Sequence, residues 1–158
     1  MSETTGLRMR AATAADSRMI RATIKAAGLD RTGLDWRNFM VAEDEAGTMA
    51  GICQVRRYWG LRELGSLYVR PELRGQGVGG ELIQACLAGA QPPVHLECVA
   101  ERQSLYEVHG FRRIPLWRAP LGLRIKALLG TTAAWVLYRQ QVIVMVWGEP
   151  SEIAAAGG

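Results

Sequence analysis

The chain has 158 residues, of which 49% are hydrophobic and 22% are charged, with a formal net charge of +4. This length accommodates one domain with a sizeable core, and the composition excludes a disordered or low-complexity chain. The glycines and prolines follow no collagen-like period and no repeat of 20 to 50 residues is present, which excludes fibrous and repeat architectures. We therefore expect one domain over residues 1–148 and a flexible tail over 149–158.

The first half of the chain predicts one helix among several strands. Asp16 can cap a helix whose apolar residues recur at helical spacing and which ends at Gly28. Alternating or continuous apolar residues predict strands in four places: 7–11, 39–43, 48–59 and 63–69.

The second half continues this alternation. A glycine-rich run, 75–80, leads into a helix over 81–89, and a short helix is expected over 104–108. Further strands are expected at 94–98 and 141–147. The order of elements predicts an α/β fold with a mixed, mostly antiparallel central sheet of about six to seven strands flanked by helices.

The glycine-rich run lies between a strand and a helix, where unpaired backbone N–H groups and the helix dipole favour an anion. Gly75, Gly77 and Gly80 formally match G-x-G-x-x-G, and Glu97 follows about twenty residues later. However, five residues including Pro71 separate the strand from the first glycine, and only 61 residues follow Glu97. This context excludes a dinucleotide-binding fold, and a Walker loop is excluded because no Gly-Lys-Ser/Thr follows.

A second interpretation uses Arg74-x-x-Gly77-x-Gly79. Together with the segment Leu-Tyr-Glu-Val-His-Gly-Phe at 105–111, it resembles the GNAT superfamily of N-acetyltransferases, whose loop signature is R/Q-x-x-G-x-G/A. The resemblance covers roughly residues 7–111 in element order and implies acetyl-coenzyme A as acyl donor and no metal. The residues it implies for cofactor binding are Leu67, Tyr68, Val69, Arg74, Gly75, Gln76, Gly77, Val78, Gly79 and Gly80.

The resemblance also implies catalytic residues. Tyr106 matches the family tyrosine, and a phenol remains a proton donor at neutral pH, so it is the candidate acid beside the leaving thiolate. Glu63 is the candidate base, and its alternative is a surface charge on an edge strand. His95 and His109 are expected to be structural or exposed, and Cys98 a small apolar residue, so we expect direct transfer without an acyl-enzyme.

The segment 112–140 is longer than closing such a fold requires. Between 108 and 148 the chain carries six basic residues and no acidic one, and Leu121, Ile125, Leu128 and Leu129 recur at helical spacing. A basic amphipathic helix in this insertion is therefore expected to pack on the core, cover the acceptor site, form a dimer contact or lie on a membrane surface. The longest uncharged run in this segment, 127–138, has 12 residues, too few for a membrane span, which needs about 20.

We expect an N-acetyltransferase that acts on a primary amine of a small molecule, including one that bears a carboxylate or phosphate. Trp36, Gln54 and Arg56 are the candidate acceptor-binding residues. No nucleic-acid-binding motif accompanies the basic residues. Three cysteines without C-x-x-C spacing argue against disulfides and a zinc site, and no apolar signal segment opens the chain, which favours the cytoplasm. The alternatives left open are a homodimer and a catalytically silent module that binds acyl-coenzyme A.

Overall fold

A computed structural model describes residues 6–128 and 141–148. The chain divides into two compact units, Met1–Ala90 and Gln91–Gly158, and each unit is described by itself. The predicted tail, 149–158, lies outside the described residues.

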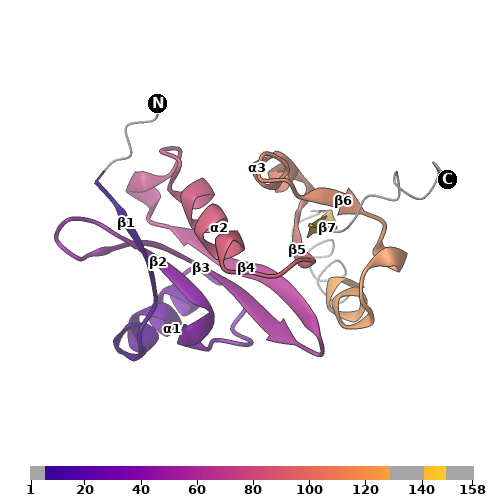
Figure 1. Ribbon diagram of the computed structural model, residues 1–158, viewed down its shortest axis with the longest axis horizontal. Helices are drawn as coiled ribbons and strands as arrows, with labels where there is room; N and C mark the ends of the chain where they lie inside the picture. Colours follow the sequence, from indigo (N-terminus) through magenta and orange to yellow (C-terminus); the bar gives the residue numbers. More distant parts are fainter. Residues whose placement is uncertain (1–5, 129–140, 149–158) are drawn as a thin grey trace. The chain divides into compact units, whose positions relative to one another are not determined.

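The first unit is an antiparallel sheet with a helix on each face (Figure 1). Its strands lie in the order β1-β2-β3-β4, and each pairs with its neighbour in antiparallel register. The strand bounds are β1 Arg8–Ala11, β2 Phe39–Glu43, β3 Met49–Tyr58 and β4 Leu61–Val69, and the helices are α1 Ser17–Ala26 and α2 Val78–Ala88. Three short 3-10 helices occupy Ala14–Asp16, Trp36–Asn38 and Pro71–Leu73.

Alternation along the strands produces two cores, one beneath each helix. On the α1 face, the buried Ile20 and Ile24 pack with Val41 and Ile52. On the α2 face, Leu82 comes so close to Gly51 that a Cβ added there would lie 2.9 Å from its side chain. Gly51 therefore lets α2 approach the sheet closely.

The β3–β4 pairing contains a bulge in its middle. Ile52 faces Tyr68 and Gln54 faces Gly65, so two residues of β4 oppose Cys53 alone. Ser66, in the bulge, has a φ of 54°, a left-handed conformation that is uncommon outside glycine. The bulge leaves backbone groups of β4 outside the regular ladder at this point.

Within its described residues, the second unit holds three antiparallel strands in the order β5-β7-β6. The strands are β5 Val94–Val99, β6 Arg112–Ile114 and β7 Val142–Trp147, and α3 spans Gln103–Glu107. Two 3-10 helices occupy Ala100–Arg102 and Leu116–Arg118, and residues 121–128 are helical.

The prediction of a mixed, mostly antiparallel α/β fold with six to seven strands is confirmed. Two differences from expectation exceed two residues. Helix α2 begins at Val78 rather than Glu81, because Gly77 is its N-cap. A Cβ added to Gly79, in this first turn, would lie 3.7 Å from the Val69 side chain of β4. Strand β6, within the expected insertion, was missed because its three residues show no alternation that stands out from the sequence.

The helix expected within the insertion is present over 121–128, but it does not bury the apolar side expected from the sequence. Leu123 and Ala127 are buried, whereas Leu121 and Ile125 are exposed by 68% and 50%. Helical spacing of apolar residues therefore did not identify the packed face here. Leu129 and the apolar run 133–138 lie outside the described residues. Among the helices of the described ranges, none is long and apolar enough to span a bilayer.

Candidate functional site

The turn before α2 is built to present bare backbone amides. Gly75 and Gly77 both adopt left-handed backbone conformations, with φ of 77° and 87°, and Gly77 is the N-cap of α2. A Cβ added to either glycine would meet no atom within 4 Å. The first hydrogen bond of the helix runs from the N–H of Glu81 to the Gly77 carbonyl, at 3.1 Å. The amides that precede Glu81 in the first turn therefore have no acceptor within the helix. Open space, free donors and the positive end of the helix dipole coincide at this turn.

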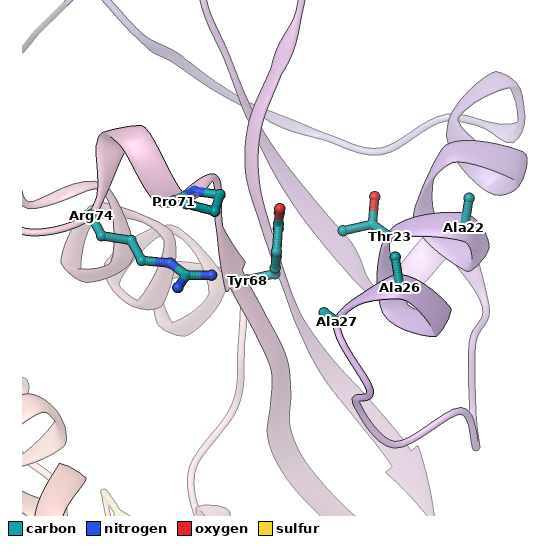
Figure 2. Close-up of a pocket in the computed structure, with 7 residues that line it drawn as sticks. All are labelled: Ala22, Thr23, Ala26, Ala27, Tyr68, Pro71 and Arg74. Carbon is teal, nitrogen blue, oxygen red and sulfur yellow. The ribbon is translucent and has the colours of Figure 1, made fainter.

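A cavity of about 530 Å³ lies beside this turn (Figure 2). Small side chains of α1 form one wall, and Tyr68 lies between them and Arg74. The Arg74 guanidinium lies 5.9 Å from the Tyr68 ring centroid, and its Nε donates to the Val69 carbonyl at 3.0 Å. The lining residues are Ala22, Thr23, Ala26, Ala27, Tyr68, Pro71 and Arg74. Arg74 thus places a positive charge at the edge of the cavity next to the glycine turn.

The neighbouring side chains support the β4 bulge. Gln54 is fully buried and its Nε2 donates to the Ser66 hydroxyl at 2.8 Å. Its Oε1 is buried and accepts no hydrogen bond within the described part of the chain. The Cys53 thiol lies 3.6 Å from the Gly65 carbonyl. These contacts fix the bulged backbone from the β3 side.

Glu63 lies at the centre of a buried polar cluster. Arg56 Nη2 lies 3.1 Å from Glu63 Oε1, and Arg56 Nε lies 3.3 Å from Oε2. The Tyr58 hydroxyl also donates to Oε2. The Glu63 side chain is only 3% exposed, so the alternative of a surface charge is wrong, and its carboxylate accepts from both donors.

Arg56 joins this cluster to the loop that follows α1. Its Nη2 lies 2.7 Å from Asp30 Oδ2, and its Nη1 donates to the Thr32 carbonyl at 2.8 Å. Burial alone would raise the pKa of Asp30, but the Thr32 amide and the Arg56 guanidinium hold it well below its usual value. Burial likewise works against the charge of Arg56, yet Glu63 and Asp30 raise its pKa. Asp30 and Glu63 are therefore both carboxylates that Arg56 holds in place.

The three residues expected to contact an acceptor lie in different settings. Trp36 begins a 3-10 helix, packs against the α1 core and has the Arg37 guanidinium 4.9 Å from its ring centroid. Gln54 and Arg56 are buried with the partners described above. Their contact with an acceptor stays a prediction, and it requires the acceptor to exchange with those partners.

Tyr106 lies in the second unit, on α3. Its side chain is nearly buried, and its ring meets Phe111 edge-to-face with centroids 6.0 Å apart. In the same unit, burial raises the pKa of Cys98 to about 11, so its thiol is protonated at neutral pH. A protonated thiol is a poor nucleophile, in line with the expectation of direct transfer. Within the described ranges, no cluster of His, Cys, Asp or Glu has the arrangement of a metal site.

Sequence reasoning missed the residues of α1 that line the cavity, and also Ser66. The small residues at positions 22, 23 and 26 share one side of α1, and Ala27 follows at its C-terminal end, a pattern that could have indicated a helix face left open for a ligand. Nothing in the sequence indicates a left-handed serine, since this conformation depends on the bulge.

Comparison with known proteins agrees with this fold. A family model described as an acetyltransferase (GNAT) domain matches residues 35–113, which is half of the chain. No curated protein matches the sequence.

Solved structures share the fold at low sequence identity. N-acetylglutamate synthase from Neisseria gonorrhoeae, complexed with coenzyme A and N-acetyl-glutamate, aligns with a TM-score of 0.66 and 16% identity over 90% of this chain. The chain spans 35% of that protein's length. Rv2747 from Mycobacterium tuberculosis, solved with coenzyme A, aligns with a TM-score of 0.67 and 19% identity, covering 89% of this chain and 98% of that one. A GNAT-family acetyltransferase from Staphylococcus aureus gives 0.63 and 14%, with coverages of 89% and 98%.

Proposed function

Since this chain belongs to the GNAT acetyltransferase family, we propose that it is an acetyl-coenzyme A dependent N-acetyltransferase that transfers the acetyl group directly to a primary amine of a small molecule. One observation carries the proposal. The turn formed by Gly75, Gln76 and Gly77 exposes backbone amides at the start of an eleven-residue helix, beside Arg74 and an open cavity. A pyrophosphate is the ligand that such a turn suits best.

The residues of the turn fit the donor's phosphates. Amides from Gln76 to Gly80 would donate to the phosphate oxygens, since the free N–H groups of a helix start point out along the helix axis. The left-handed Gly75 and Gly77 allow this approach because neither carries a side chain. Arg74, now over Tyr68, is close enough along the chain to turn its guanidinium toward the same phosphates.

Strand β4 would position the rest of the donor. The acetyl thioester of coenzyme A supplies the activated acyl group. Backbone groups of Leu67 and Val69, next to the bulge at Ser66, would pair with the amides of the pantetheine arm and orient the thioester carbonyl. A donor aimed at that carbonyl stabilises the negative charge that develops on it.

Two side chains are assigned to proton transfer. Tyr106 would donate a proton to the sulfur as it leaves, because its phenol is protonated at neutral pH. Glu63 would accept the proton of the amine. Its carboxylate has two internal donors, Arg56 and Tyr58, so the proton has to arrive at an oxygen that already accepts hydrogen bonds.

The proposed acceptor is a small primary amine. A carboxylate or phosphate group on the same molecule would suit basic surroundings. Trp36, Gln54 and Arg56 would line its site. The gonococcal synthase, bound to N-acetyl-glutamate, gives an example of an amino acid product on this fold.

The full engagement of Glu63 favours a second candidate, a silent module that binds acyl-coenzyme A without turnover. A screen separates the two. Amino acids, polyamines, aminoglycosides and peptides are each mixed with acetyl-coenzyme A, and thiol release is measured against Gly79→Glu as a control. Release with one class identifies an enzyme and its acceptor. A thermal shift with acetyl-coenzyme A but no release with any amine identifies the silent module.

A further inference from the structure

A second cavity, of about 350 Å³, lies in the first unit on the α2 side of the sheet. It borders the C-terminal end of α2, around Gly89, whereas the glycine turn lies at the helix's opposite end. An eleven-residue helix is about 16 Å long, so this cavity is separate from the proposed donor site.

Three arginines, Arg37, Arg57 and Arg62, line this cavity, and none of its lining residues is acidic. Arg37 has a partner, Asp35, at 3.2 Å. Arg57 and Arg62 have no ion-pair partner within the described residues, and the Nε of Arg62 is buried without a hydrogen bond there. The side chains around the cavity thus carry a charge of about +2 once Asp35 is counted.

Arg57 and Arg62 are register partners across the β3–β4 hairpin. Residues directly opposite in an antiparallel pair have Cβ atoms about 4.5 to 5.5 Å apart, and like charges there destabilise the sheet. Two further points concern the pair formed by Arg57 and Arg62. The pair also lines a neighbouring cavity of about 390 Å³ at the hairpin turn. The forks of two adjacent arginines match the oxygens of a single phosphate or carboxylate group.

We propose that Arg37, Arg57 and Arg62 bind a small molecule that carries a phosphate monoester or two carboxylates, at a site distinct from the proposed donor site. An anion placed between Arg57 and Arg62 removes their repulsion and supplies the acceptor that Arg62 Nε lacks. Met40, Val55 and Ala85 add apolar surface to the cavity, so a ligand with an apolar body binds more tightly than a bare anion.

A rival explanation is that the arginines only complement the C-terminal carbonyls of α2, where cations are favourable. The two explanations predict opposite effects of removing a charge. If the arginines serve the helix end, Arg62→Gln lowers the melting temperature in buffer without oxyanions. If they form an anion site, Arg62→Gln raises it, because the repulsion with Arg57 is lost.

The test measures the melting temperature of the whole chain in low-salt buffer. Inorganic phosphate, phenyl phosphate, succinate and sodium chloride are each added separately, at equal ionic strength. We expect a saturable rise with phenyl phosphate that exceeds that with inorganic phosphate and is absent with sodium chloride. The succinate series distinguishes a dicarboxylate from a phosphate ligand. Arg57→Gln and Arg62→Gln should each weaken binding about 10- to 100-fold, as expected for one lost charge-assisted hydrogen bond.

Arg31→Gln is the matched control, since Arg31 is an exposed arginine of the same unit outside this cavity, and it should bind as the wild type does. All variants should keep the thermal shift with coenzyme A, which makes this test independent of the proposed function. The proposal is overturned if no oxyanion raises the melting temperature beyond sodium chloride, or if both glutamine variants bind as the control does. Arg57 is exposed, so Arg57→Gln tests the site even if Arg62→Gln folds poorly.

Discussion

Arg56 and Glu63 face each other as register partners of β3 and β4, and their charged groups lie 3.1 Å apart in the interior of the first unit. Their side chains are 5% and 3% exposed, so neither charge is compensated by water. Asp30, more exposed, extends the pair to the loop after α1. Removing one member of a buried pair leaves the other charge without compensation, and this decides what variants of the cluster should do.

Arg56→Met should lower the free energy of unfolding by about 3 to 5 kcal/mol, the range for breaking a buried pair. Urea unfolding at pH 7 measures it. The double variant Arg56→Met/Glu63→Gln should recover part of this loss, because it no longer buries a lone carboxylate. Losses that simply add in the double variant would contradict a direct coupling between the two side chains.

Glu63→Gln tests the base. The amide keeps the shape of the carboxylate but cannot take up a proton, so turnover should fall about 10²- to 10⁴-fold if Glu63 is the base. The rising limb of the pH–rate profile should also disappear in this variant. Tyr58→Phe is the control, since it removes one donor to Glu63 and leaves the carboxylate in place. A Glu63→Gln enzyme with wild-type turnover across pH would assign Glu63 to positioning alone.

The pH dependence of the free energy of unfolding should report the titration of Asp30. Its pKa is lowered in the folded protein, so its ionised form contributes stability above the ordinary value of about 4, and this is lost as the pH falls toward the folded pKa. Asp30→Asn should therefore be less stable than the wild type at pH 7, and the difference should shrink below pH 4. Urea midpoints at pH 7, 5, 4 and 3 measure this, and a constant difference would rule out the Asp30 titration.

The sequence predicted those features that depend on local pattern. Alternation located the strands, and the glycines before α2 located the candidate phosphate turn, because left-handed turns favour glycine. Features that depend on register could not be predicted. The pairings of Arg56 with Glu63 and of Arg57 with Arg62 follow from hairpin alignment, and Ser66 is left-handed only because β4 bulges there. The packed face of residues 121–128 was misjudged because helical spacing does not say which apolar stripe meets the core.

Coenzyme A should stabilise the protein through the glycine turn. At 100 times its dissociation constant, a ligand that binds only the folded state adds about 2.7 kcal/mol. Gly79→Glu should abolish the thermal shift, because a carboxylate in the first turn of α2 fills the phosphate space with like charge. Ala88→Glu, at an exposed position in the last turn of the same helix and outside both cavities, is the matched control. A shift with NADH and none with coenzyme A would overturn the assignment of the turn.

Tyr106→Phe should lower turnover about 10²- to 10⁴-fold and leave coenzyme A affinity nearly unchanged, the pattern for loss of a positioned proton donor. The substitution removes only the hydroxyl, so the edge-to-face contact with Phe111 remains and α3 should stay folded. Single-turnover rates across pH, with affinity from thermal shifts, separate chemistry from binding. The rate of the wild type should fall at high pH as the phenol ionises, and the variant should lack this descending limb. If the variant instead loses affinity and keeps its rate once saturated, Tyr106 contributes to binding and another group protonates the thiolate.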